Sequence, residues 1–285
     1  MRFALCNELL DDRPLDDAFR FIAETGYEAV ELAPYTIAES DGTVTPERAA
    51  EAARLAARYG LDFTGLHWLL AGTRDLHVGA ADPERRRRTL DHLTHLTRLC
   101  ADLGGRVLVF GSPGQRSTPP GTPPEENLAR AVDTFATWGR TAAALGVTVC
   151  LEALPVAETD MLNTTQEVVD VVRAIDSPAV RMVLDVKSMS DERVPIPRLV
   201  ELAAPHLAYF QANDANRGGP GFGTTDFVPV FQALAAVGYD GDMSVEAFDA
   251  TPGAETVARR SLTYLRDCAV RAARGDATPD EGAAR

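Results

Sequence analysis

The chain alternates between short apolar runs and longer segments with helical spacing, and this alternation occurs eight times. The short runs are rich in β-branched residues, as buried strands are, and the longer segments repeat alanine and leucine at the spacing of one helix face. Strict alternation of strand and helix implies parallel strands joined by right-handed crossovers. Eight repeats favour closure over an open sheet, and no GxGxxG motif follows the first strand. The sequence therefore predicts a (β/α)8 barrel of a single domain.

The predicted elements fall at regular intervals along the chain. The strands are predicted at Phe3–Cys6, Ala29–Leu32, Asp62–Leu66, Val107–Phe110, Val147–Leu151, Val180–Leu184, Leu207–Phe210 and Met243–Val245. The helices are predicted at Leu15–Glu24, Pro46–Tyr59, Pro83–Leu103, Glu125–Leu145, Thr165–Ile175, Ile196–Ala204, Phe227–Val237 and Thr256–Ala273. Glycines stand between a helix and the next strand in four places, as C-cap glycines do: Gly26, Gly60, Gly146 and Gly238.

The length of 285 residues suits one α/β barrel, which we predict over residues 1–273. The remaining segment, 274–285, reads RGDATPDEGAAR and has too few apolar residues to pack, so a disordered tail is expected. The proline-rich segment Ser112–Pro124 is long for a simple connection. It is interpreted either as a lid or rim of the site or as a passive surface loop.

Charge, hydropathy and cysteine content argue against several classes of protein and partner. The formal net charge of −14 repels nucleic-acid backbones, so no nucleic-acid partner is expected. The N-terminal stretch MRFALCNELL lacks the apolar region of a signal peptide, and no run approaches the roughly 20 apolar residues of a membrane span. The four cysteines are far apart and form no CxxC motif, so buried thiols are expected. A cytoplasmic protein with no membrane partner is predicted.

Polar residues stand at the ends of four successive predicted strands. Glu152 ends VTVCLE, Asp185 ends RMVLD, Gln211 ends AYFQ and Glu246 ends MSVE. The intervals between them are 33, 26 and 35 residues, each about one strand and one crossover. In a parallel barrel these ends meet at the carboxyl-terminal mouth, where ligands bind.

Three carboxylates gathered at buried strand ends repel one another unless a counter-charge is present. A divalent cation supplies that charge. All four donors are oxygen atoms, a hard ligand set that suits Mg²⁺ or Mn²⁺ better than zinc. We therefore predict a metal site formed by Glu152, Asp185, Gln211 and Glu246.

This order of strand-end residues resembles the xylose isomerase-like TIM barrel sugar phosphate isomerase and epimerase family, which includes D-tagatose 3-epimerase and hydroxypyruvate isomerase. The segment LEALPVAETDMLNT carries Glu152 and Glu158 at the spacing of the ketose epimerases. Gln211 and Arg217 keep the interval between the metal histidine and the substrate-binding arginine of those enzymes. The segment SVEAF carries the final glutamate, Glu246. By this resemblance, Glu158 and Arg217 are expected to contact substrate.

Two positions depart from the ketose 3-epimerase pattern. Gln211 replaces the usual histidine, as in the hydroxypyruvate isomerase branch, and Ser188 in DVKSM replaces a substrate-contacting histidine. Lys187 is therefore the expected contact at one end of the sugar. His67 and Trp68 end the third predicted strand in GLHWLL. The histidine is interpreted either as a substrate contact or as a rim residue, and the tryptophan as an apolar wall.

The predicted function is metal-dependent isomerisation or epimerisation of a keto-sugar or related polyol ketone. Glu152 and Glu246 would act as acid and base on a carbon-bound proton next to the carbonyl, through an enediolate. Two groups on opposite faces would invert the carbon, whereas one group doing both steps would give aldose–ketose isomerisation.

Two other functions remain open. One is a lyase of the same superfamily, either an inosose-type dehydratase or a 3-keto-C-glycoside deglycosidase subunit, which starts from the same proton abstraction. The other is a non-catalytic sugar-binding barrel. The resemblance allows a homo-oligomer, and a C-glycoside lyase would add a second, different subunit.

Overall fold

Eight parallel strands form a closed barrel in the order of the sequence in this computed structural model, which describes residues 1–39, 43–73 and 75–275. The first strand pairs with the last, so no sheet edge is left in the barrel. The strands are β1 Phe3–Cys6, β2 Ala29–Leu32, β3 Asp62–Leu66, β4 Val107–Phe110, β5 Thr148–Leu151, β6 Val180–Asp185, β7 Leu207–Ala212 and β8 Met243–Val245. The predicted (β/α)8 barrel is confirmed.

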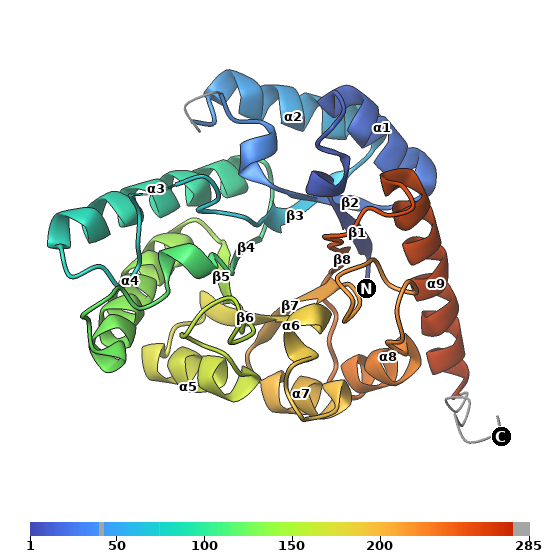
Figure 1. Cartoon of the computed structure of the whole chain (residues 1–285). Coiled ribbons are helices and arrows are strands. Elements are labelled where there is room, and N and C mark those ends of the chain that lie inside the picture. Colours follow the sequence, from blue (N-terminus) through green and yellow to red (C-terminus); the bar gives the residue numbers. More distant parts are fainter. Residues whose placement is uncertain (40–42, 74, 276–285) are drawn as a thin grey trace.

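Helices surround the barrel as an outer ring (Figure 1). The long ones are α1 Leu15–Thr25, α2 Pro46–Tyr59, α3 Pro83–Asp102, α4 Pro124–Ala144, α5 Thr165–Ile175, α7 Ile196–Ala203, α8 Phe227–Ala236 and α9 Ala254–Arg274. Short turns of helix also follow strands at η1 Asn7–Leu10, η2 Pro34–Thr36, η3 Pro113–Gln115 and α6 Val186–Met189. The sequence analysis predicted none of these four short turns.

Local capping explains where the helices begin and end. Thr164 and Glu167 form a reciprocal capping box at the start of α5, and Thr45 caps α2 before Pro46. Gly26 follows α1 with φ 100°, in the left-handed region that favours glycine at a helix C-cap. These signals are local, so the predicted bounds of the eight long helices agree with the structure to within two residues at each end.

Side chains fill the barrel from within. Val107, Val109, Cys150, Val183 and Tyr209 form a small apolar cluster, separate from the large apolar layer between the strands and the helices. The two layers follow from the period of two along a strand, which sends alternate side chains inward and outward.

The last long helix, α9, runs to Arg274, and Gly275 caps it. The rest of the predicted tail, 276–285, lies outside the described residues. The four cysteines are free and buried, as predicted. Among the described helices, none combines the length and apolar character needed to cross a membrane.

Candidate functional site

The four predicted metal ligands lie at the carboxyl-terminal mouth of the barrel. Each stands two residues after a buried residue of its strand, and the period of two therefore turns it toward the barrel interior. These preceding residues are Cys150, Val183, Tyr209 and Ser244. Asp185 pairs with Gln211 across β6 and β7, and Gln211 pairs with Ser244 across β7 and β8. None of the four predicted ligands is more than 8% exposed.

Asp185 and Glu152 are held by Ser188 in α6, and Asp185 also by Asn213, which follows β7. Asp185 caps α6 by accepting a hydrogen bond from the Ser188 amide at 2.8 Å, and its other oxygen accepts one from Asn213 Nδ2 at 2.6 Å. Glu152 Oε1 accepts a hydrogen bond from the Ser188 hydroxyl at 3.1 Å. Ser188, which stands where the ketose epimerase pattern has histidine, therefore links the two carboxylates.

Gln211 presents an oxygen atom without a hydrogen-bond partner. Its Nε2 donates to Glu31 Oε1 at 3.1 Å, which fixes the amide, and its Oε1 is buried and unpaired. A buried carbonyl oxygen without a partner is costly unless a ligand or cation completes it. Together with the carboxylates of Glu152, Asp185 and Glu246, this orphaned oxygen fits a hard divalent cation.

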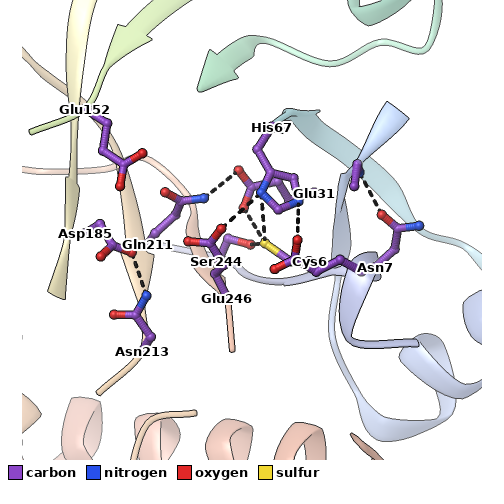
Figure 2. A network of polar contacts seen from close by, with 12 residues as sticks. Cys6, Asn7, Glu31, His67, Glu152, Asp185, Gln211, Asn213, Ser244 and Glu246 are labelled. Carbon is purple, nitrogen blue, oxygen red and sulfur yellow. Dashed lines mark hydrogen bonds and ion pairs between the residues drawn. The ribbon is translucent and has the colours of Figure 1, made fainter. Parts of the chain in front are cut away.

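Glu246 lies between the predicted ligands and a second group of polar side chains (Figure 2). Its Oε1 is 3.3 Å from Nδ1 of His67, which follows β3. Cys6, the last residue of β1, has its sulfur 3.9 Å from the same nitrogen. In the part of the chain that the structure describes, Cys6, His67 and Glu246 are the one set of three acidic, histidine or cysteine residues whose donor atoms all lie within 4.8 Å.

Burial and mutual repulsion shape the acid–base properties of the carboxylates. Burial and, after it, the nearby Asp185 raise the pKa of Glu152 to about 7, against the opposing effect of Lys187. Burial, Asp185 and Glu152 together raise the pKa of Glu246 well above its usual value. The two glutamates therefore share one electrostatic environment with Asp185, and both favour a proton or a cation nearby.

The carboxylates of Glu152 and Glu246 face a common pocket. Its empty volume is about 490 Å³, part of which is open to solvent. All five predicted substrate-binding residues line it: His67, Trp68, Glu158, Lys187 and Arg217. A hollow lined by aromatic rings and by several convergent polar groups suits a small-molecule ligand.

Phe248, which the sequence analysis missed, organises one wall of the pocket. Lys187 Nζ lies 4.9 Å and the Arg217 guanidinium 4.8 Å from the centre of its ring, and Trp68 packs edge-on against it. Both cations also approach Glu158 Oε1, at 2.9 Å for Lys187 and 3.6 Å for Arg217. Burial alone lowers the pKa of Lys187, but Asp185 and Glu152 outweigh burial and raise it, so this side chain stays charged.

The glycine-rich turn after β7 positions Arg217. Asp214 is fully buried, and its carboxylate accepts hydrogen bonds from the amides of Gly223 and Thr225. Its carbonyl accepts one from the Arg217 amide at 2.8 Å. The turn therefore fixes the backbone of Arg217, which has a positive φ of 70°.

The model of the xylose isomerase-like TIM barrel family matches residues 19–268. The chain belongs to this family. Among characterised members, it is 27% identical over 190 residues to L-ribulose 3-epimerase of Mesorhizobium japonicum, covering 67% of this chain and 64% of that protein. It is 34% identical over 119 residues to D-psicose 3-epimerase of Ruminiclostridium cellulolyticum, covering 42% of this chain and 41% of that protein. The chain thus spans less than two thirds of the length of these two relatives.

A third relative aligns over its full length. The 3-dehydro-D-guloside 4-epimerase of Escherichia coli is 24% identical over 274 residues, covering 94% of this chain and 100% of that protein. Among solved structures, D-psicose 3-epimerase with D-tagatose from Clostridium cellulolyticum superposes with a TM-score of 0.84 at 20% identity, over 94% of this chain and 99% of that one. This similarity supports the barrel fold.

In this member of the xylose isomerase-like TIM barrel family, the proline-rich segment 112–124 begins at the rim of the pocket. Ser112 and Pro113 line the pocket, and Arg116 is fully buried beneath it. Arg116 Nη1 donates to the Glu152 carbonyl at 2.7 Å, which ties the segment to the end of β5. The start of the segment therefore belongs to the pocket rim, in agreement with the first interpretation.

Sequence reasoning missed the polar residues beneath the pocket. Glu31 is fully buried in β2 and accepts hydrogen bonds from Gln211 and from the Cys6 thiol at 2.9 Å. Glu8 in η1 is nine-tenths buried, and its carboxylate is 3.9 Å from His67 Nε2. A signal for Glu31 was present, since a glutamate within the apolar run AVEL needs a partner.

Proposed function

We propose that this protein is a divalent-metal-dependent sugar epimerase that exchanges a proton on the carbon next to a ketone. The observation that carries the proposal is the placement of Glu152 and Glu246, directly after β5 and β8, at one pocket lined by all five predicted substrate contacts. The relatives support the same chemistry, because the L-ribulose and D-psicose enzymes are 3-epimerases and the E. coli relative is a 4-epimerase.

Glu152, Asp185, Gln211 and Glu246 would hold the cation, with Mn²⁺ or Mg²⁺ suited to their oxygen atoms. A bound divalent cation lowers the pKa of a carbon-bound proton next to a coordinated carbonyl and stabilises the negative charge that forms. The fit rests on the unpaired Gln211 oxygen and on the raised pKa values of the glutamates.

The two glutamates supply the proton chemistry. One carboxylate removes the proton from carbon, and the other, carrying a proton, returns one from the opposite face of the enediolate. Inversion at that carbon is the result. Ser188 restrains Glu152, and His67 restrains Glu246, so both carboxyl groups are positioned before substrate enters.

The remaining pocket residues would bind and orient the sugar. Trp68 and Phe248 offer apolar surfaces for carbon–hydrogen faces of the ligand. Lys187 and Arg217 can donate hydrogen bonds to hydroxyl or carbonyl oxygens, and Glu158 can accept one from a hydroxyl. His67, directly after β3, faces the same space.

Solvent deuterium exchange tests the proposal directly. The Mn²⁺-loaded protein in D₂O should incorporate deuterium next to the carbonyl of at least one compound in a panel of ketoses, keto-inositols and 3-keto-glycosides. The variants Glu152→Gln and Glu246→Gln should lose exchange by at least about a hundredfold. Glu201→Gln, on the outer surface of α7, is the matched control and should retain it.

The products separate the alternatives. Deuterium with an inverted centre supports epimerisation, and an aldose product indicates isomerisation. Loss of water or of an aglycone indicates the lyase. No deuterium in any compound of the panel rules out the enzyme proposal in favour of a non-catalytic sugar-binding barrel.

A further inference from the structure

Cys6, His67 and Glu246 bring one sulfur, one nitrogen and one oxygen donor together below the pocket (Figure 2). They come from β1 and from the residues that follow β3 and β8. We propose that these three side chains form a second cation site, selective for Zn²⁺ or Co²⁺, which shares Glu246 with the predicted oxygen-ligand site. Binding at this site does not depend on the proposed function.

The spacing of the donors matches tetrahedral coordination. Ordinary Zn–S and Zn–N bond lengths at a tetrahedral angle put sulfur and nitrogen about 3.6 Å apart, and nitrogen and oxygen about 3.4 Å apart. The structure places Cys6 Sγ 3.9 Å from His67 Nδ1, and that nitrogen 3.3 Å from Glu246 Oε1. The sulfur and the Glu246 oxygen lie within 4.8 Å of each other, against about 3.6 Å for ordinary Zn–S and Zn–O bonds at a tetrahedral angle. Shifts of up to about 1 Å therefore complete the geometry.

The second imidazole nitrogen supports the same assignment. If Nδ1 of His67 binds a cation, Nε2 carries the proton and needs an acceptor. Nε2 has no hydrogen-bond partner, and the nearly buried Glu8 carboxylate lies 3.9 Å from it. Metal-binding histidines typically donate this proton to a carboxylate, and a shift of about 1 Å would bring Glu8 within hydrogen-bonding distance of Nε2.

The Glu31 carboxylate can accept the proton that the Cys6 thiol loses. The Cys6 S–H already donates to Glu31 Oε2 at 2.9 Å. When a cation bonds to sulfur, the S–H bond breaks, its electron pair forms the metal–sulfur bond, and the proton passes to the Glu31 carboxylate. The charge of the cation is thus met by the Cys6 thiolate and the Glu246 carboxylate.

Donor type separates this site from its neighbour. Thiolate and imidazole favour zinc and cobalt, whereas Asp185 and Gln211 offer only oxygen, which suits Mg²⁺ and Mn²⁺. His67 and Glu246 also line the substrate pocket, so a cation can reach Cys6 from that side. Because Glu246 belongs to both sets, zinc at the sulfur site draws this carboxylate away from the pocket.

Cobalt spectroscopy tests the site without relying on activity. Chelator-treated full-length protein, titrated with Co²⁺, should develop thiolate-to-cobalt charge-transfer absorption in the near ultraviolet that saturates at one equivalent. Zn²⁺ should abolish this absorption, and excess Mg²⁺ should not. Cys6→Ala should eliminate it and weaken Zn²⁺ binding by more than the roughly 10–100-fold that loss of an outer partner causes. Cys150→Ala, which removes another buried thiol, should retain both.

Wild-type protein that shows no such absorption overturns the proposal, whatever the variants do. Absorption that persists in Cys6→Ala, with an unchanged melting temperature, also overturns it, because the thiolate must then be another cysteine. If the proposed function holds, Zn²⁺ should inhibit deuterium exchange by the Mn²⁺-loaded protein, and Cys6→Ala should relieve that inhibition. Failure of exchange alone bears on the function and leaves the cobalt result standing.

Discussion

At the scale of single residues, Glu31 decides which atom Gln211 shows to a ligand. Because its carboxylate accepts from Gln211 Nε2, the amide oxygen is left free. Glu31→Ala should let the amide rotate and weaken Mn²⁺ binding roughly 10–100-fold, measured by calorimetric titration. Glu31→Gln keeps an acceptor for Nε2 and should bind Mn²⁺ nearly as well as wild type. Equal losses in both variants would mean that the charge of Glu31, and not its hydrogen bond, matters.

The aromatic ring of Phe248 positions two cationic side chains through cation–π contacts. Lys187 and Arg217 each approach within 5 Å of the ring centre, and such contacts contribute about 0.5–1 kcal/mol apiece. Phe248→Leu should therefore raise the KM for a sugar substrate roughly 5–30-fold, with a smaller effect on kcat. Phe222→Leu removes a comparable contact with Arg260 outside the pocket and serves as the kinetic control. A kcat effect as large as the KM effect would contradict a role in binding alone.

The strand-end residues were predictable because each closes an apolar run, and the barrel brings all such ends to one mouth. Cys6 and Glu31 were not predictable as site residues, for a physical reason. They lie within strands, where a side chain faces either the barrel interior or the helices, and the sequence alone does not distinguish these faces when both are buried. Phe248 lies beyond the end of β8, in a loop whose path depends on tertiary contacts.

At the scale of elements, His77 joins the β3–α3 connection to the rim segment after β4. Its Nδ1 accepts from the Gly79 amide at 3.0 Å, so Nε2 carries the proton and donates to the Ser117 carbonyl at 2.8 Å. This arrangement requires neutral imidazole, and burial lowers the pKa of His77. The unfolded chain then binds a proton more readily, so stability is full above pH 6.5 and falls as the pH drops below it.

The variant His77→Gln should lessen this loss of stability, which chemical denaturation at pH 7.5 and pH 5.5 would measure. His95→Gln, on the exposed face of α3, is the control and should keep the wild-type pH dependence. An unchanged pH dependence in His77→Gln would show that other groups carry the acid sensitivity.

Element bounds were predictable where local chemistry fixes them, as at the capping box of α5 and the glycine after α1. The turn α6 was missed because it is four residues long and has no apolar period to detect. It begins on Asp185, whose carboxylate both caps α6 and faces the metal ligands. One residue therefore ends a strand, starts a helix and belongs to the site.

At the scale of the whole molecule, closure of the barrel was predictable from the number of strand and helix pairs. The contacts that join the start of the chain to its end were not. Arg2 of the first strand region binds Asp242 before the last strand through two hydrogen bonds of 2.9 and 2.8 Å. Tyr27 donates to the Ala258 carbonyl at 2.8 Å and links the start of the chain to α9. These pairs join residues more than 200 positions apart, which local sequence patterns do not reveal.

The predicted oxygen ligands come from four successive strands, so a cation bound there should stabilise the barrel as a unit. Clustered carboxylates raise the free energy of the folded state, and a divalent cation offsets this repulsion only when the chain is folded. Mn²⁺ at 100 times its Kd should add about 2.7 kcal/mol of stability, which corresponds to a rise in Tm of about 5 °C at the unfolding entropy expected for 285 residues. Scanning calorimetry of chelator-treated protein with and without Mn²⁺ measures the shift. The double variant Glu152→Gln/Asp185→Asn removes two charges, so it should melt at or above the temperature of the metal-free wild type. Its Tm should no longer respond to Mn²⁺. The control variant Glu201→Gln should keep the wild-type response to Mn²⁺. A Tm that rises equally with Mn²⁺ in the double variant would place the cation elsewhere on the protein.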